Sequence, residues 1–269
     1  MDYKLLVLDL DGTLTNSKKE ITPQTLDVLL ELQESGMKIA LASGRPLYGI
    51  TPLAEQLKLS HYGGYILAFN GGHVVDCRTK EIIHAQRLEQ DLMPWLYGLA
   101  SQSDTTILTY DGPNIVTETP EDQYVQHEVF LTKMTLKKVE SFADYVSYNP
   151  EKCMIVGEPD KLPALENIIN QEAGHKMAAY RSEPFFLELV PKGIDKALSL
   201  ERLLKHISLT PDQMVAVGDG YNDLSMIKYA GLGVAMGNAQ DVVKEAAQVV
   251  TLSNEEDGVA YLIKKYLMV

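Results

Sequence analysis

The amino-acid sequence predicts an α/β fold, a doubly wound parallel sheet with an α+β domain inserted into it. The first and last thirds of the chain alternate short apolar strands with helical segments, which is typical of a parallel sheet covered by helices. Between them, strand and helix patterns follow one another without that alternation. We therefore expect a Rossmann-like core formed by residues 1–82 and 191–269, and an inserted domain formed by residues 83–190.

The first third contains short apolar runs separated by two helical segments. The expected strands span residues 4–8, 38–43 and 65–69, and the expected helices span 22–35 and 46–57. The first helix has clear boundaries, because Thr22 can serve as its N-cap, Pro23 suits its first turn and Gly36 can end it. The order strand, helix, strand, helix, strand indicates parallel pairing.

The middle and last thirds differ in how their elements alternate. In the middle, helices are expected at 89–102, 135–147 and 160–173, and strands at 105–109, 128–132, 153–157 and 185–190. In the last third, helices are expected at 195–206, 222–229, 239–247 and from about 255, and strands at 214–218, 233–235 and 249–251. The last third thus resumes the pattern of the first, and we expect both to form one sheet.

The composition indicates a cytoplasmic protein, a monomer or small homo-oligomer, that binds neither nucleic acid nor membranes. With 24 Lys and Arg against 37 Asp and Glu, the net charge of −13 repels the phosphates of nucleic acids and anionic lipids. Residues 84–188 carry most of this negative charge, with 8 basic and 17 acidic residues. We expect no signal peptide, because residues 1–4 lead directly into a strand-like run, and no apolar run approaches the ~18 residues of a membrane span.

Two carboxylates at the end of the first strand indicate a functional site. Asp9 and Asp11 follow the apolar run 5–8 almost directly, and Gly12 breaks the strand after them. Burying a charge is costly unless the charge is paired or bound to a metal. Solvation in a surface loop therefore does not explain two carboxylates at the end of a buried strand.

Other polar residues are expected beside this pair, because ligands of open parallel sheets bind beyond the carboxyl ends of the strands. Ser43 and Asp219 end two further strands, and Asp223 follows four residues later. Lys196 lies in the first turn of a helix, where the dipole disfavours a cation, so an anion is expected nearby. Singly, Asp223 could cap a helix, Ser43 could form a turn and Lys196 could be a surface lysine. Together they indicate one site.

These residues resemble the four motifs of the haloacid dehalogenase (HAD) superfamily. The segments that carry the resemblance are Asp9-Leu10-Asp11-Gly12-Thr13, Ser43, Lys196 and Gly218-Asp219-Gly220-Tyr221-Asn222-Asp223. Residues 42–46, 70–71 and 191–196, together with the size and position of the insertion, resemble its Cof-type, class IIB sugar-phosphatase branch.

The resemblance implies a Mg²⁺-dependent phosphatase that hydrolyses small phosphorylated metabolites, in particular sugar phosphates, through an aspartyl-phosphate. Asp9 would be the nucleophile, and Asp11 the general acid and base. Asp9, the main-chain carbonyl of Asp11 and Asp219 would hold the metal, with Asp223 as a further ligand or as a partner of one. The implied phosphate-binding residues are Leu10, Thr13, Ser43, Gly44, Lys196 and Asn222. The Thr13 hydroxyl could also orient Asp11, and the inserted domain would be a lid that contacts the leaving group.

Two alternatives share part of this pattern. A phosphomutase of the same superfamily has the same motifs and would transfer the phosphoryl group without releasing phosphate. A receiver-like phospho-acceptor module also gathers Asp, Ser or Thr and Lys around Mg²⁺. Receivers, however, are usually half this length and lack such an insertion.

Overall fold

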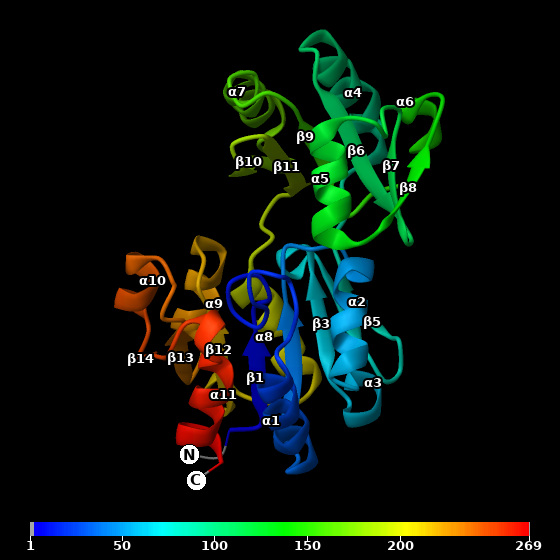
Figure 1. Cartoon of the computed structure of the whole chain (residues 1–269). Helices are drawn as coiled ribbons and strands as arrows, with labels where there is room; N and C mark the ends of the chain where they lie inside the picture. The colour runs from blue at the N-terminus through cyan, green and yellow to red at the C-terminus, as the bar shows by residue number, and fades with distance from the viewer. Residues whose placement is uncertain (1–2, 269) are drawn as a thin grey trace. The chain divides into compact units, whose positions relative to one another are not determined.

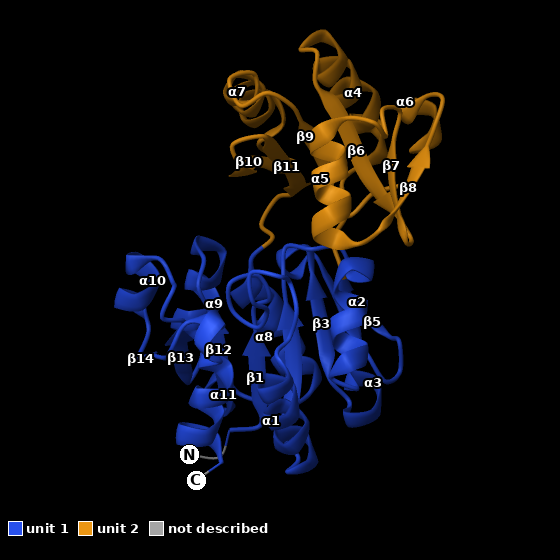
Figure 2. Ribbon diagram, in the orientation of Figure 1, with its two compact units in different colours: residues 1–84, 195–269 blue, residues 85–194 orange. Residues whose placement is uncertain are grey.

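The computed structural model describes residues 3–268, which form two compact units (Figure 2). Unit 1 contains the described residues up to His84 and from Asp195 onward, and unit 2 contains Ala85–Ile194. From the sequence, the boundaries of the inserted domain were expected after residues 82 and 190. Within residues 3–268, no helix is both long enough and apolar enough to cross a membrane.

Unit 1 is built on an eight-stranded sheet with the order β14-β13-β12-β1-β2-β3-β4-β5 (Figure 1). Its strands are β1 (Leu5–Leu8), β2 (Lys38–Ala42), β3 (Tyr65–Ala68), β4 (His73–Asp76), β5 (Ile82–Ala85), β12 (Met214–Gly218), β13 (Leu232–Ala235) and β14 (Val249–Val250). The pairs from β14 through to β3 are all parallel, which confirms the predicted α/β class. Because β1 lies between β12 and β2, segments far apart in the sequence meet at the centre of the sheet.

Helices cover both faces of this sheet. The helices are α1 (Pro23–Glu34), α2 (Leu47–Gln56), α3 (Leu59–Tyr62), α8 (Lys196–His206), α9 (Leu224–Tyr229), α10 (Asp241–Ala246) and α11 (Gly258–Leu262), with shorter turns η1 (Phe69–Gly71), η3 (Pro211–Gln213), η4 (Tyr221–Asp223), η5 (Asn254–Glu256) and η6 (Ile263–Leu267). Side chains of α8 and α9 share a buried cluster with β1, β2, β3 and β12. In Figure 1, α1 and α11 lie in front of the sheet and α8 lies behind it.

Two strands of unit 1 were not predicted. β4 pairs antiparallel with β3 after the tight turn η1, and β5 follows β4 in the sheet. Both strands have only four residues, and β4 has polar residues at its two ends, His73 and Asp76. Four residues carry little of the periodicity by which a strand is recognised, and the polar ends of β4 shorten its apolar run further.

Unit 2 contains a six-stranded sheet with the order β10-β11-β9-β6-β7-β8. Its strands are β6 (Thr106–Asp111), β7 (Asn114–Thr117), β8 (Thr135–Lys138), β9 (Cys153–Val156), β10 (Met177–Glu183) and β11 (Phe186–Pro191); its helices are α4 (Met93–Gln102), α5 (Gln123–Thr132), α6 (Phe142–Tyr145) and α7 (Leu162–Ala173), with the turn η2 (Gln90–Leu92) before α4. The strand pairs are antiparallel except that β7 and β8 are parallel. Side chains of α4 and α7 form a buried cluster with one face of the sheet.

Two elements predicted for the middle of the chain are wrong. Residues 128–132 were expected to form a strand but belong to α5, because the Asp122 side chain caps that helix at the N–H groups of Tyr124 and Val125. Residues 135–147 were expected to form one helix. They form the edge strand β8, which pairs with β7, and the short helix α6. In both places, capping and strand pairing outweigh the local propensity of the residues.

A buried ion pair links β11 to the residue before β9 in unit 2. The Nζ atom of Lys152 lies 2.6 Å from Oε2 of Glu188, and the two side chains are only 5% and 10% exposed. The Ser182 hydroxyl donates to the other oxygen of Glu188 at 2.8 Å. Removing one partner of such a pair leaves the other charge buried without compensation.

We therefore expect Lys152→Met to lower the free energy of unfolding by about 3–5 kcal/mol. Lys176→Met is the matched control, because Lys176 forms its ion pair with Glu89 at the surface of the same unit, and we expect a change below about 1 kcal/mol. Urea unfolding followed by circular dichroism measures both. Equal losses in the two variants would contradict the expectation.

Candidate active site

The carboxyl end of β1 brings buried carboxylates close to the turn after β12. Asp9 follows β1 directly, is 6% exposed, and donates its N–H to the carbonyl of Val217 at 3.0 Å. Gly12 adopts a left-handed conformation with φ of 84°. A Cβ at Gly12 would lie 2.4 Å from Oδ2 of Asp219, so glycine allows the two segments to approach one another.

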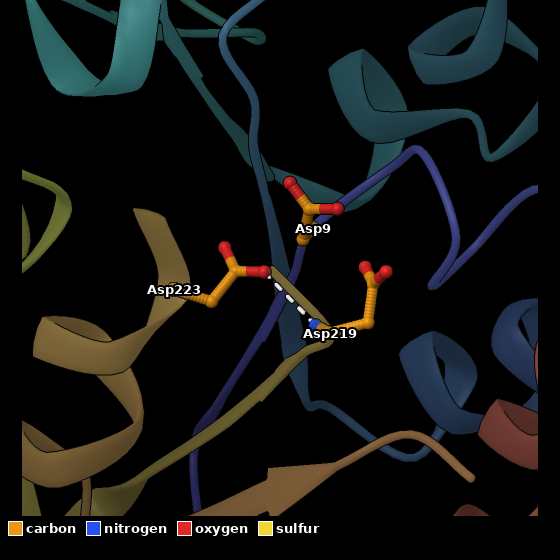
Figure 3. A group of neighbouring side chains, drawn as sticks. All are labelled: Asp9, Asp219 and Asp223. Atoms are coloured by element: carbon orange, nitrogen blue, oxygen red, sulfur yellow. Dashed lines mark hydrogen bonds between the residues drawn. The ribbon is translucent and has the colours of Figure 1, made fainter. Parts of the chain in front are cut away.

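Three carboxylates gather at this edge of the sheet. Ligand oxygens of Asp9, Asp219 and Asp223 all lie within 4.8 Å of one another (Figure 3). Oδ2 of Asp223 accepts hydrogen bonds of 2.9 Å from the N–H groups of both Asp219 and Gly220, which holds the turn after β12 in place. A set of carboxylate oxygens is the donor set that Mg²⁺ and other hard divalent cations prefer.

A buried lysine lies among these carboxylates. Lys196 is 1% exposed, and its Nζ donates to Oδ1 of Asp9 at 2.7 Å, to Oδ1 of Asp223 at 2.6 Å and to the carbonyl of Ala42 at 2.8 Å. Burial alone lowers the pKa of Lys196, but the carboxylates of Asp223 and Asp9 reverse the effect and hold the pKa above its ordinary value. Lys196 therefore stays charged.

The carboxylates themselves titrate unusually. Burial and the nearby charge of Asp223 raise the pKa of Asp9 well above its ordinary value, against the opposing effect of Lys196. Burial also raises the pKa of Asp219 to about 6, although the hydrogen bond from Thr13 opposes the rise. Both shifts have the same physical cause, because a crowded, partly desolvated group of carboxylates disfavours negative charge until a cation joins it.

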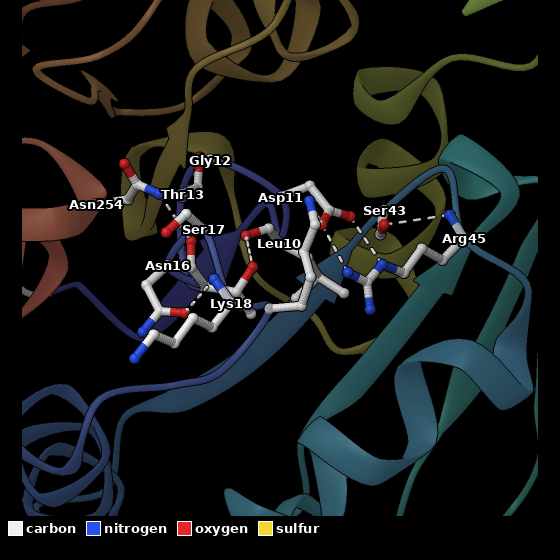
Figure 4. A network of polar contacts seen from close by, with 12 residues as sticks. Leu10, Asp11, Gly12, Thr13, Asn16, Ser17, Lys18, Ser43, Arg45 and Asn254 are labelled. Carbon is white, nitrogen blue, oxygen red and sulfur yellow. Dashed lines mark hydrogen bonds and ion pairs between the residues drawn. The ribbon is translucent and has the colours of Figure 1, made fainter. Parts of the chain in front are cut away.

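Asp11 has different surroundings, formed by two cationic residues that were not among the predicted site residues. Figure 4 shows one of them, Arg45, beside Asp11. Arg45 donates from Nε to Oδ2 of Asp11 at 2.7 Å and from Nη2 to Oδ1 at 2.6 Å, and Lys19 donates to Oδ1 at 2.7 Å. Burial alone raises the pKa of Asp11, but the contacts with Arg45 and Lys19 outweigh it and lower the pKa.

Lys19 and Arg45 differ in how far the sequence could have revealed them. Lys19 lies in a turn closed by Asn16, whose side-chain oxygen accepts from the N–H groups of Lys18 and Glu20. Its left-handed conformation, with φ of 64°, gives no recognisable sequence signal. Arg45 belongs to a segment that the family resemblance singled out, so its position near Ser43 was a usable signal.

The predicted contact between Thr13 and Asp11 is wrong. The Thr13 hydroxyl donates to Oδ1 of Asp219 at 2.9 Å, because the turn at Gly12 directs Thr13 toward the loop after β12. Both oxygens of Asp11 meanwhile accept from Arg45 and Lys19.

The remaining predicted phosphate-binding residues lie on the loops at the ends of β1, β2 and β12. Ser43 is 3% exposed, and its hydroxyl accepts the N–H of Arg45 at 3.1 Å. The Asn222 side chain donates to Oδ1 of Asn70 at 3.0 Å. Leu10 is fully buried and its carbonyl accepts the N–H of Thr15 at 2.9 Å. Asn70 was not among the predicted site residues.

Comparisons with known proteins agree on one family. A family model described as haloacid dehalogenase-like hydrolase matches residues 6–263. The chain is 32% identical over 269 residues to the Bacillus subtilis protein named "Putative phosphatase YxeH", with 99% of each chain covered. It is 30% identical over 268 residues to the B. subtilis 5-amino-6-(5-phospho-D-ribitylamino)uracil phosphatase YcsE, which covers 100% of this chain and 97% of that one. A crystal structure of a haloacid dehalogenase-like hydrolase from Bacteroides thetaiotaomicron matches with a TM-score of 0.96 and 51% identity, covering 98% of this chain and 99% of that one.

The pKa of Asp219 predicts how stability depends on pH without metal. Its pKa is about 6 in the folded protein and roughly 3.9 in an unfolded chain. Folding favours the protonated form, so the stabilisation from this group is complete below the unfolded pKa and is lost as pH rises through about 6. In EDTA, the thermal midpoint of the parent should therefore fall relative to that of Asp219→Asn as pH rises from about 4 to about 7. Parallel pH profiles of the two proteins would contradict this expectation.

Proposed function

Because this chain belongs to the haloacid dehalogenase-like hydrolases and is a phosphatase, we propose that it hydrolyses small phosphorylated sugars or polyols with Mg²⁺, through an aspartyl-phosphate on Asp9. One observation above all supports the proposal. Ligand oxygens of Asp9, Asp219 and Asp223 lie within 4.8 Å of one another, and the buried ammonium of Lys196 donates to Asp9 and Asp223. Such a cluster suits a reaction whose catalysis consists largely of positioning and of neutralising negative charge.

The donor set fits Mg²⁺, because this cation prefers oxygen ligands and the cluster supplies carboxylate oxygens. The surroundings also raise the pKa of Asp9, so a bound cation would stabilise its ionised form. Asp9, Asp219 and the main-chain carbonyl of Asp11 would hold the ion, and Asp223 would be either a fourth ligand or a residue that fixes the loop around Asp219. When bound, the ion supplies positive charge that offsets the repulsion between an anionic nucleophile and an anionic phosphate.

Asp9 acts as the nucleophile. One of its oxygens forms a bond to phosphorus while the bond between phosphorus and the leaving-group oxygen breaks. Lys196 donates to Oδ1 of Asp9, which orients the carboxylate for the attack and opposes the rise in its pKa. Water then attacks the aspartyl-phosphate, which releases inorganic phosphate and restores Asp9.

Asp11 moves the protons. It gives a proton to the leaving-group oxygen in the first step and takes one from the attacking water in the second. Both Asp11 oxygens accept from Arg45 and Lys19, so one of these contacts must open before Asp11 can reach the leaving group. The phosphate itself would be bound by the remaining donors of the site, namely the amides of Leu10 and Gly44 and the side chains of Thr13, Ser43, Lys196 and Asn222.

The chemistry of a relative supports a sugar or polyol as the leaving group. By its name, YcsE removes a phosphate from a ribityl chain, which is a polyol. This chain aligns with YcsE over its whole length. Its net charge of −13 makes polyanions poor candidates, so we propose a single phosphate on a small polyhydroxylated carbon chain.

We expect Asp9→Asn to abolish phosphate release, because a carboxamide is a far weaker nucleophile than a carboxylate. The assay measures inorganic phosphate from ribose 5-phosphate, ribitol 5-phosphate and 4-nitrophenyl phosphate with Mg²⁺. EDTA should give the same loss in the parent, and added Mg²⁺ should restore activity. Asp27→Asn, an exposed position on α1, is the control and should behave as the parent does. Equal activity of Asp9→Asn and the parent would refute the proposal.

We expect Asp11→Asn to slow the second step more than the first when the leaving group needs no proton. With 4-nitrophenyl phosphate, this variant should release about one equivalent of nitrophenol per enzyme in a rapid phase. Its steady-state turnover should then be slower than that of the parent by a factor of about 10²–10⁴. Stopped-flow absorbance measures the two phases. An Asp11→Asn variant that retains the steady-state rate of the parent would rule out this role.

A further inference from the structure

The turn that follows β3 has an unusual backbone. Three consecutive residues have positive φ angles, 52° for Phe69, 55° for Asn70 and 95° for Gly71. This region favours glycine and tolerates asparagine, but it is disfavoured for a bulky residue such as phenylalanine. Strained backbone of this kind persists only where the surrounding contacts hold it, and it is found disproportionately at functional sites.

Contacts from two other elements hold this turn. The N–H groups of Phe69 and Asn70 donate to the carbonyls of Arg45 and Ser43 at 3.0 and 2.8 Å. The Ser199 hydroxyl, on α8, donates to the carbonyl of Gly71 at 2.8 Å. The turn is thus attached to the loop after β2 and to the helix that carries Lys196.

The result is that the Asn70 side chain lies between two predicted phosphate-binding residues. A Cβ at Gly44 would lie 3.4 Å from Nδ2 of Asn70, so the carboxamide packs against the backbone of Gly44. Oδ1 of Asn70 accepts a hydrogen bond of 3.0 Å from Nδ2 of Asn222. Asn70 therefore connects the loop after β2 with the loop after β12.

This contact also fixes the orientation of the Asn222 carboxamide. Nδ2 of Asn222 faces Asn70, and Oδ1 of Asn222 lies on the side of Gly220, where an added Cβ would come within 2.7 Å of it. A carboxamide nitrogen carries two N–H groups, so one can donate to Asn70 and the second to a phosphate oxygen. The reverse orientation would direct the carbonyl oxygen of Asn222 toward the phosphate, and two acceptors repel.

We propose that Asn70 is a positioning residue that holds the donor end of the Asn222 carboxamide toward the substrate phosphate. The proposal rests on the proposed function, because that function makes Asn222 a phosphate donor. Asn70 acts in it through Asn222, and it takes no part in the covalent steps.

The competing explanation is that asparagine stands at position 70 only because it tolerates a left-handed backbone. Asn70→Gly separates the two explanations, since glycine accepts this conformation without strain but removes the carboxamide. Lys58→Gly is the matched control, because Lys58 is exposed, also left-handed with φ of 52°, and lies before α3.

The test measures the affinity of the protein for inorganic phosphate in the presence of Mg²⁺ by calorimetry, together with KM and kcat for 4-nitrophenyl phosphate. We expect Asn70→Gly to weaken phosphate affinity and raise KM by about 3- to 10-fold, as the loss of one hydrogen bond does, with a smaller change in kcat. Asn222→Ala should have a similar effect, and the double variant should be no worse than Asn222→Ala alone, because the two residues act as a unit. Lys58→Gly should match the parent, and the thermal midpoint of Asn70→Gly should not fall.

Three results would overturn the inference. The first is an Asn70→Gly variant that binds phosphate as tightly as the parent does. The second is a double variant in which the effects of the two single variants multiply, and the third is an Asn222→Ala variant whose phosphate affinity equals that of the parent. The proposed function fails separately, through an active Asp9→Asn variant, and phosphate affinity can be measured whatever that assay shows.

Discussion

The hydrogen bonds of the Lys196 ammonium are the interaction on which the rest of the site depends. This buried cation reaches Asp9 after β1, Asp223 after β12 and the carbonyl of Ala42 at the end of β2. Without it, the carboxylates of Asp9 and Asp223 would face each other in a desolvated space. Because Lys196 begins α8, this helix starts at the edge of the sheet where Asp9 and Asp223 lie.

The cluster around Lys196 remains negative, and this imbalance gives the site its chemistry. The carboxylates of Asp9, Asp219 and Asp223 outnumber the one ammonium, and burial together with the neighbouring carboxylates raises the pKa values of Asp9 and Asp219. A divalent cation would restore the balance and attract the phosphate of a substrate. Asp11 stands apart electrostatically, since Arg45 and Lys19 lower its pKa. Two carboxylates separated by one residue thus have opposite shifts in pKa, because burial and Asp223 dominate at Asp9 whereas contacts with Arg45 and Lys19 dominate at Asp11.

Much of the fold could be predicted from the sequence, because the core strands are continuous apolar runs and the first helix has a recognisable cap at Thr22. The predicted elements are wrong where contacts between other segments determine the secondary structure. Residues 128–132 have the composition of a strand but follow a capping aspartate, and residues 135–138 become an edge strand because β7 is available to pair with them. At the site, Arg45 stood in a segment that the family resemblance singled out, whereas Lys19 reaches Asp11 only through a left-handed turn that leaves no sequence pattern.

The sequence alone was sufficient to predict the α/β class, the strand ends that carry Asp9, Asp11 and Asp219, and the need for an anion beside Lys196. These features depend on local patterns of apolar, charged and capping residues. Only the tertiary structure decided which groups meet. Thr13 donates to Asp219 rather than to Asp11, and Asn222 donates to Asn70, which lies 152 positions away in the chain. Partner choice of this kind depends on distances between segments remote in sequence, and strand order and backbone turns set those distances.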